Sequence, residues 1–108
     1  MEEIEFNEWQ KMDLRVAEIL EVQDHPDADK LYVLKIKIGN EEKTIVAGIR
    51  KHYTKEDLIG QKIIVFTNLK PAVLRGIKSE GMLLAASKDG KVVLLTPEDD
   101  IDSGAKIS

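Results

Sequence analysis

The sequence predicts an all-β domain, because short β-like runs separated by turn residues dominate it and helical patterns are brief. Its 108 residues, 43% hydrophobic and 33% charged, are enough for one packed domain and too few for two. There is no internal repeat, low-complexity tract or linker. We therefore expect a single domain over residues 1–108.

Composition excludes several classes of protein. No apolar run approaches the roughly 20 residues that a helix needs to cross a bilayer. The acidic start, Met1–Glu5, lacks the basic and then apolar pattern of a signal peptide. The absence of cysteine excludes a disulfide framework, a zinc ribbon, an iron–sulfur cluster and a thiol nucleophile. We therefore expect a cytoplasmic protein with no membrane partner.

The N-terminal segment predicts a short helix. Asn7 stands three residues before Gln10, which is an N-cap pattern. We expect one or two turns within residues 4–12, with Phe6 and Trp9 packed against the body of the domain.

The next segments predict the first strands of the sheet. Residues 13–22 favour a strand through their aliphatic and β-branched content, although their imperfect alternation would also suit a helix. A turn or loop at 25–29 follows from its proline and aspartates. Residues 31–38 are the clearest strand, with apolar residues at every second position, and Gly39-Asn40 predicts a tight hairpin onto a strand at 42–47. The apolar face of the alternating strand comprises Tyr32, Leu34, Ile36 and Ile38.

The second half predicts a brief helix and three more strands. The helix spans 53–59, with Thr54 as N-cap, Asp57 at the third helical position and Gly60 as its stop. Asp89-Gly90 predicts a second hairpin. The three strands are expected at Lys62–Thr67, Gly81–Ser87 and Lys91–Thr96.

The order of these elements matches one small barrel. Five strands, a short helix between the third and fourth, and a short N-terminal helical turn are the arrangement of the OB-fold, whose second and third strands and neighbouring loops bind oligomers. An SH3-like barrel or a small sandwich would satisfy the same signals, because periodicity does not fix strand pairing.

The charge is unevenly distributed along the chain. The overall formal net charge is -4, yet residues 1–29 carry -8, residues 30–78 carry +7 and residues 79–108 carry -3. A basic middle segment places a positive face on an acidic molecule, as a polyanion partner requires. Lysines that merely solvate exposed strand faces would give the same pattern.

The sequence argues against enzymatic chemistry. Its two histidines, His25 and His52, are separated by the predicted hairpin, and no nucleophile signature accompanies them. His25, Asp27 and Asp29 alternate in a proline-containing loop, where turn formation explains the carboxylates better than a metal site. Both glycine-rich phosphate motifs are absent. We expect neither an enzyme nor a metal or cofactor site.

Residues 68–82 hold the richest set of polar side chains. Lys and Arg can neutralise phosphates, Asn and Ser can bond sugars or base edges, and glycine lets the backbone approach a ligand. Met82 can supply an adaptable apolar surface beneath a base. The same residues would equally serve as turns and as the start of a core strand, with Gly76 and Gly81 as turn or bulge positions.

Five motifs follow one another along nearly the whole chain, at Asp13–Ala17, His25–Leu31, Ala47–Ile49, Asn68–Pro71 and Ser79–Met82. Together they resemble the tRNA-binding domain family, the module appended to many methionyl-tRNA synthetases. The resemblance implies the OB barrel, noncatalytic and structure-selective tRNA binding, and a homodimer. A free-standing chain of this length is similar to the beta subunit of methionyl-tRNA synthetase and to a small accessory tRNA-binding protein, so this synthetase is an expected partner.

The resemblance also implies which residues bind tRNA. The matching motifs carry Lys30 and Asn68 over to the binding face. Three further residues of the second matching stretch should line the same groove, namely Arg75, Ser79 and Met82. Charge and position alone add three lysines, Lys35, Lys70 and Lys78. The chain lacks the aromatic platform on which many OB-folds stack bases, which favours recognition of tRNA shape over its sequence. The alternative is a protein-binding OB-fold dimer similar to the export chaperone related to this family.

Overall fold

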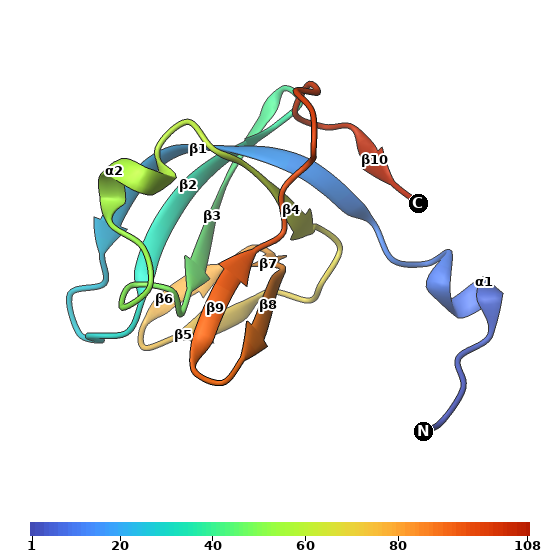
Figure 1. Cartoon of the computed structure of the whole chain (residues 1–108), viewed down its shortest axis with the longest axis horizontal. Coiled ribbons are helices and arrows are strands. Elements are labelled where there is room, and N and C mark those ends of the chain that lie inside the picture. The colour runs from blue at the N-terminus through green and yellow to red at the C-terminus, as the bar shows by residue number, and fades with distance from the viewer.

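The computed structural model describes residues 1–108 and confirms an all-β, OB-like barrel (Figure 1). One antiparallel sheet curls around the core in the order β3-β2-β1-β4-β7. Its strands are β1 (Leu14–Asp24), β2 (Tyr32–Ile38), β3 (Glu41–Ala47), β4 (Lys62–Phe66) and β7 (Met82–Leu83). Two hairpins extend it, β5 (Ala72–Leu74) with β6 (Ile77–Ser79) and β8 (Ala85–Lys88) with β9 (Lys91–Leu94).

The imperfect alternation of β1 comes from a β-bulge. The pairing with β2 shifts register between Ile19 and Glu21, so that Leu20 has no partner. A bulged residue lets a strand bend and twist more strongly. The same strand can therefore pair with both β2 and β4 and carry the sheet around the barrel. The interpretation as a strand is confirmed, and the strand ends two residues later than the pattern predicted.

Strand β2, with an apolar residue at every second position, supplies much of the core. Tyr32, Leu34 and Ile36 are buried while Lys35 and Lys37 are exposed, as predicted. Gly39 alone of the hairpin pair has a positive φ, +61°, which is typical of a two-residue turn with glycine first.

Helix α2 (Lys55–Leu58) covers one end of the barrel between β3 and β4, as predicted. Its N-cap is Thr54, whose Oγ1 accepts the Asp57 N–H at 3.2 Å. Leu58 is the one buried residue of this helix and belongs to the main core cluster. Gly60 follows with φ +85°, a conformation in which glycine carries no steric penalty.

The N-terminal helix α1 (Phe6–Trp9) differs from the expectation in two ways. Its N-cap is Glu5, and Asn7 lies inside the helix, so the predicted cap is wrong. Phe6 and Trp9 do not reach the core: they are 69% and 40% exposed, and the helix projects from the barrel (Figure 1). Four residues form a single turn and reach no core surface. No helix of the structure is long and apolar enough to span a membrane.

The C-terminal half contains three features that the sequence patterns did not predict. The segment predicted as one strand at 81–87 divides into β7 and β8, because it leaves β4 and turns to pair with β9. The hairpin β5–β6 turns at Arg75-Gly76, which lacks the usual Asn-Gly signal. Strand β10 (Lys106–Ile107) pairs with the start of β1.

Contacts between β3 and the end of β6 close the barrel. The Glu80 N–H donates to the Thr44 carbonyl at 2.9 Å. The Thr44 N–H donates to Glu80 Oε1 at 3.2 Å. Beside them the Val46 N–H donates to Ser79 Oγ at 2.9 Å, and the Ser79 hydroxyl donates to the Gly81 carbonyl at 2.8 Å. Ser79 therefore connects the edge strand β3 to the segment that returns to β4.

Replacing Gly81 with alanine is expected to destabilise the fold by roughly 2–3 kcal/mol, the scale of an overpacked core. A Cβ at this position would lie 2.9 Å from the Phe66 carbonyl oxygen, which belongs to the backbone and cannot rotate away. The matched control is Gly48→Ala, whose Cβ would meet nothing closer than 3.8 Å. Urea unfolding of both variants measures the difference, and equal stabilities would contradict the close packing of Gly81.

Candidate nucleic-acid interface

Two loops meet at one end of the barrel, and we call them together the loop face. The first is the β1–β2 loop, residues 25–31, and the second is the β5–β6 hairpin, residues 72–79. Figure 1 shows the β1–β2 loop and the tip of the hairpin at the same corner of the molecule. They correspond to the loops beside strands 2 and 3 with which OB-folds bind oligonucleotides.

Side chains bond the two loops directly. His25 is 2% exposed, and its Nε2 lies 3.0 Å from the Leu74 carbonyl oxygen. Its Nδ1 accepts the Asp27 N–H at 3.0 Å. From the other side, Arg75 Nη2 donates to the Asp27 carbonyl at 3.0 Å. The hairpin tip is therefore hydrogen-bonded to the β1–β2 loop at two points.

An open pocket of about 510 Å³ lies where the loops meet. Lys30 and Arg75 both line it and both are exposed, so the structure brings these two predicted site residues together. Asp27 and Asp29 line the same pocket, which makes its local charge balanced. Any net positive charge at this face must therefore come from Lys and Arg side chains of neighbouring segments.

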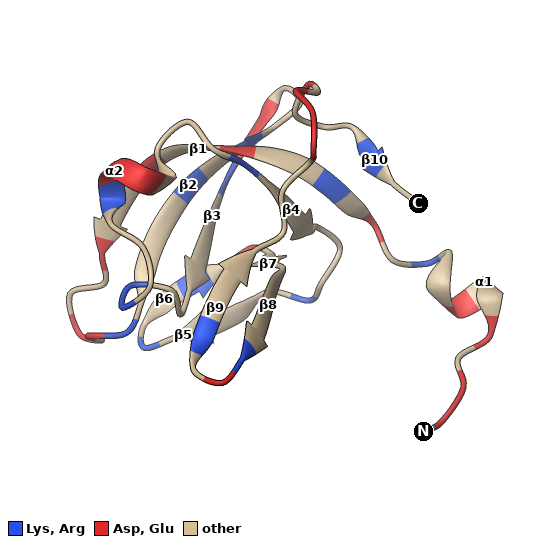
Figure 2. Ribbon diagram, viewed as in Figure 1, with Lys and Arg blue, Asp and Glu red and all other residues tan.

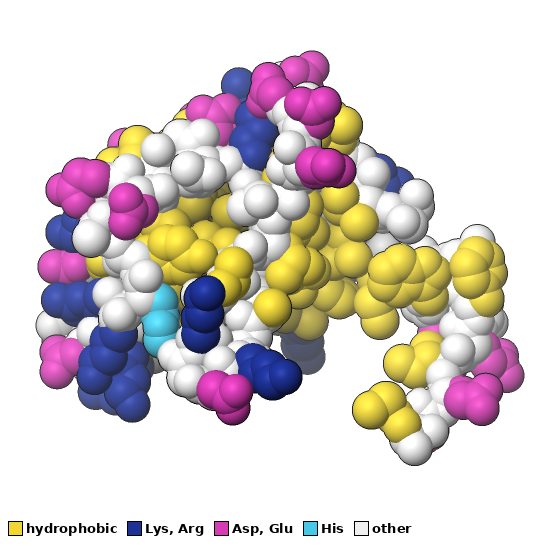
Figure 3. All heavy atoms as spheres, viewed as in Figure 1, with side chains coloured by type: hydrophobic (Ala, Val, Ile, Leu, Met, Phe, Trp, Pro, Cys, Tyr) yellow, Lys and Arg dark blue, Asp and Glu magenta, His cyan; other side chains and the backbone are white.

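Basic side chains do gather around the loop face. Figures 2 and 3 show Lys and Arg at the β1–β2 loop, at the segment after β3 and at the tip of the β5–β6 hairpin. Lys51 and Lys78 are exposed and form no ion pair. Arg50 lies 3.3 Å from Asp24 and bonds the Ala28 carbonyl at 3.4 Å, so it braces the β1–β2 loop. The face is thus positive at its rim.

Arg75 has an unusual backbone conformation. Its φ is +52°, and Gly76 follows with φ +91°, so both central residues of the turn are left-handed. A non-glycine residue in this region costs about 1–3 kcal/mol and is found where the surrounding structure requires it. The Arg75 side chain is held in place by its bond to the Asp27 carbonyl. The fold thus maintains a strained arginine at the point where a ligand could reach it.

Three other predicted site residues lie in three different parts of the structure. Lys70 is exposed in the segment between β4 and β5. Met82 is half-buried on β7, opposite Phe66 of β4. Lys35 is exposed on the outer face of β2 and lies 3.9 Å from Glu42. Lys35 therefore belongs to the outside of the sheet.

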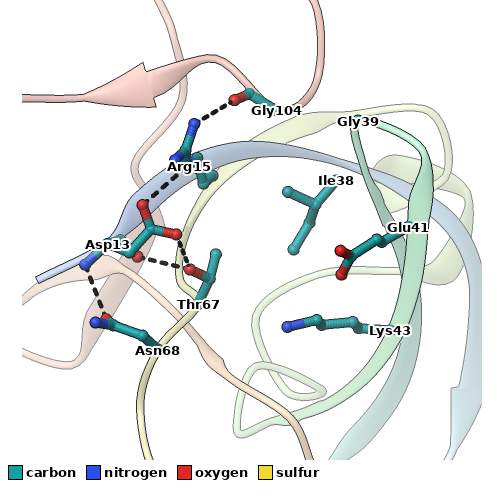
Figure 4. Close-up of a pocket in the computed structure, with 9 residues that line it drawn as sticks. All are labelled: Asp13, Arg15, Ile38, Gly39, Glu41, Lys43, Thr67, Asn68 and Gly104. Atoms are coloured by element: carbon teal, nitrogen blue, oxygen red, sulfur yellow. Dashed lines mark hydrogen bonds and ion pairs between the residues drawn. The ribbon is translucent and has the colours of Figure 1, made fainter.

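Asn68 lies in a different pocket, shown in Figure 4. Its Oδ1 accepts the Asp13 N–H at 2.8 Å and its Nδ2 donates to the Lys11 carbonyl at 2.7 Å. This pocket of about 470 Å³ lies at the start of β1, whereas the loop face lies beyond its other end. Both polar groups of the Asn68 amide are used to fix the chain that enters β1, and Asn68 is not part of the loop face.

Asp13 is the central charge of that second pocket. The hydroxyl of Thr67 donates a hydrogen bond to its carboxylate, and this bond, followed by the Arg15 guanidinium at 2.9 Å, holds the Asp13 pKa below its ordinary value of 3.8. Since the folded state favours the ionised carboxylate, the stabilisation is present above pH 3.8 and is lost as the pH falls through the lower folded pKa. The side chains of this pocket therefore stabilise the fold at the start of β1.

Ser79 is placed differently from the expectation that it lines the binding groove. It is 2% exposed, and its hydroxyl is engaged on both sides by backbone groups of β3 and Gly81. The sequence motif that contains Ser79 therefore has a structural role, which is to close the barrel. Its assignment to an exposed binding surface is corrected by this burial.

Sequence reasoning did not single out Arg50 and Lys51, which follow β3 and lie beside the loop face, where Arg50 bonds the Ala28 carbonyl. Both stand in the basic middle segment, so the charge distribution alone could have added them.

Comparison with known proteins gives the chain its family. Residues 14–106 match the family model described as "Putative tRNA binding domain". Methionine--tRNA ligase of Thermococcus onnurineus is 49% identical over 107 residues, which cover 99% of this chain and 15% of that protein. The chain thus spans about 15% of the length of this curated relative.

Solved structures agree with this match over the whole length of their chains. The MetRS related protein from Pyrococcus horikoshii superposes with a TM-score of 0.93 at 36% identity, covering 100% of both chains. The chaperone CsaA from Bacillus anthracis superposes with a TM-score of 0.89 at 34% identity, covering 99% of this chain and 100% of the other. With the family model matching most of its residues, this chain belongs to the tRNA-binding domain family.

Proposed function

We propose that the protein binds folded tRNA, without catalysing a reaction, through the loop face and its basic rim. The observation that carries this proposal is the pair of hydrogen bonds that holds the two loops together and brings Lys30 and Arg75 into one pocket. Cationic side chains on a fixed frame suit a sugar–phosphate backbone, which presents negative charge at regular spacing. Membership of the tRNA-binding domain family supports the same function.

Recognition is proposed to depend on tRNA shape. The exposed aromatics Phe6 and Trp9 lie on α1, away from the loop face, and Tyr32 is buried in the core. No exposed aromatic platform is therefore available on the loop face for stacking of splayed bases. Backbone and shape contacts discriminate folded from unfolded RNA and only slightly between tRNAs.

Competitive filter binding with folded tRNA, duplex RNA and single-stranded RNA of equal length tests the proposal. Folded tRNA is expected to be retained best, and affinity is expected to fall with salt at a log–log slope of about -0.7 to -0.9 per neutralised phosphate. Equal and negligible retention of all three RNAs at low salt would refute tRNA binding.

The finer role that we propose is that of a beta subunit or accessory of methionyl-tRNA synthetase, acting in trans in the cytoplasm. The chain is similar to a small part of several enzymes named methionine--tRNA ligase. A module that binds tRNA and associates with a synthetase raises the local tRNA concentration without high intrinsic affinity. Copurification with the synthetase, followed by sizing of the complex, tests this role, and a lack of association would leave a free tRNA binder.

We also propose a homodimer that forms through the N-terminal arm, which is the segment 1–13 before β1 and contains α1. Figure 3 shows apolar side chains along this arm, and Phe6, Trp9, Met12 and Ile107 line a pocket between α1 and β10. In a symmetric pair, each arm would cover the same surface of the other copy. We expect the Phe6→Ser, Trp9→Ser double variant to lower the mass measured by light scattering from twice 12.1 kDa to 12.1 kDa. A wild-type mass of 12.1 kDa would refute the dimer.

A protein-binding function is the second candidate, because the chain is as similar to two chaperones named CsaA as to the MetRS related protein. Exposed Leu69 and Val73 could contact an extended polypeptide. Peptide binding that persists in high salt, and is unchanged when Lys30 and Arg75 are replaced with alanine, would favour this function over tRNA binding.

A further inference from the structure

His25 is the one buried histidine, and no part of the proposed tRNA contact uses it directly. It lies at the end of the β1–β2 loop nearest to β1, with its ring between that loop and the last residue of β5. Its burial removes it from any ligand. What remains for it to do is to hold other groups in place.

The hydrogen bonds of His25 determine its tautomer. A carbonyl oxygen can only accept, so Nε2, which lies 3.0 Å from the Leu74 carbonyl, carries the proton. A backbone N–H can only donate, so Nδ1, which receives the Asp27 N–H at 3.0 Å, carries none. The two ring nitrogens thus have different tasks: Nδ1 shapes the β1–β2 loop, and Nε2 connects that loop to the hairpin.

We propose that His25 is a positioning residue for tRNA binding, which fixes the spacing between Lys30 and Arg75 through its Nε2 bond to Leu74. This inference rests on the proposed function. Leu74 directly precedes Arg75, so a bond to its carbonyl fixes the strand end from which the strained turn begins. Lys30 follows in the loop that the same histidine shapes. Without the bond from His25 to Leu74, the Arg75 side chain would provide the remaining hydrogen bond between the hairpin and the β1–β2 loop. The same guanidinium is needed to bind phosphate.

Two substitutions separate the tasks of the ring. Asparagine places its amide near the position of Nδ1, so His25→Asn keeps an acceptor for the Asp27 N–H and loses the bridge to Leu74. Glutamine reaches the position of Nε2, so His25→Gln keeps a donor for the Leu74 carbonyl and loses the bond to Asp27. The Asp27 N–H is then free to bond water, because Asp27 is exposed.

The experiment measures tRNA affinity and urea unfolding for the wild type and both variants, together with the NMR order parameters of residues 75–78 in the RNA-free proteins. We expect His25→Asn to weaken tRNA binding about 10-fold, the effect of losing roughly one preorganising bond. His25→Gln should stay within about 3-fold of the wild type. The order parameters should fall in His25→Asn and be retained in His25→Gln.

The experiment distinguishes failure of the His25 proposal from failure of the proposed tRNA binding. Equal losses of affinity in the two variants, or losses that only follow stability, would reduce His25 to a general structural residue and overturn the proposal. Unchanged affinity in His25→Asn would overturn it as well. Failure of the wild type to retain any RNA would refute the proposed function instead, while the order parameters would still show whether His25 couples the loops.

Discussion

Replacing Lys30 and Arg75 together with alanine is expected to weaken tRNA binding about 100-fold near 0.1 M salt, since each charged contact contributes about 1.5 kcal/mol. The two side chains line one pocket and come from loops that are hydrogen-bonded to each other, so they engage the same stretch of backbone. Loss of two phosphate contacts also lowers the steepness of the log–log salt dependence by about 1.5. Filter binding across a salt series measures both effects.

The control for this variant changes the net charge equally at another place. Lys35 and Lys37 are exposed on the outer face of β2. The Lys35→Ala, Lys37→Ala protein should bind tRNA within about 3-fold of the wild type, because screened charges far from the interface contribute little. Equal losses in the two double variants would mean that overall charge, and not the loop face, attracts tRNA.

Replacing Ser79 with alanine is expected to lower the free energy of unfolding by about 2–3 kcal/mol. The hydroxyl accepts the buried Val46 N–H and donates to the Gly81 carbonyl, so its removal leaves both backbone groups without their partner in a dry environment. Such orphaned groups cost more than the net value of a hydrogen bond. The affinity of the folded protein for tRNA should be nearly unchanged. Urea unfolding and filter binding, performed on the same samples, separate the two quantities.

Ser87 provides the comparison for Ser79. It is exposed on β8, so Ser87→Ala should alter the unfolding free energy by less than about 0.5 kcal/mol. A Ser79→Ala protein as stable as the wild type but unable to bind tRNA would restore Ser79 to the binding surface, contrary to its burial.

The parts of the fold that the sequence predicted are those that local rules determine. The period of two in β2 placed Tyr32, Leu34 and Ile36 inside, and the Thr54 cap located α2. The β1 bulge at Leu20 explains why alternation there was imperfect. Strand β10 could not be predicted, because it is two residues long and exists only through its partner β1.

In the candidate site, too, local sequence rules do not reveal a role that depends on tertiary contacts. Lys30 and Arg75 were predicted from motif and charge, and the loops that carry them do meet. Asn68 and Ser79 also stand in motifs that resemble the family, but they satisfy backbone groups, a role that residue type alone does not distinguish from ligand binding. The left-handed turn at Arg75 could not be predicted from the sequence, because arginine rarely adopts a positive φ.

Amide chemical shifts of the nitrogen-15-labelled protein, followed as unlabelled folded tRNA is added, test most directly where tRNA binds. We expect perturbations concentrated in residues 25–31, 48–54 and 72–79, with the Asn68 pocket at the start of β1 little changed. Perturbations confined to that pocket or to the outer face of β2, with the two loops unaffected, would contradict it.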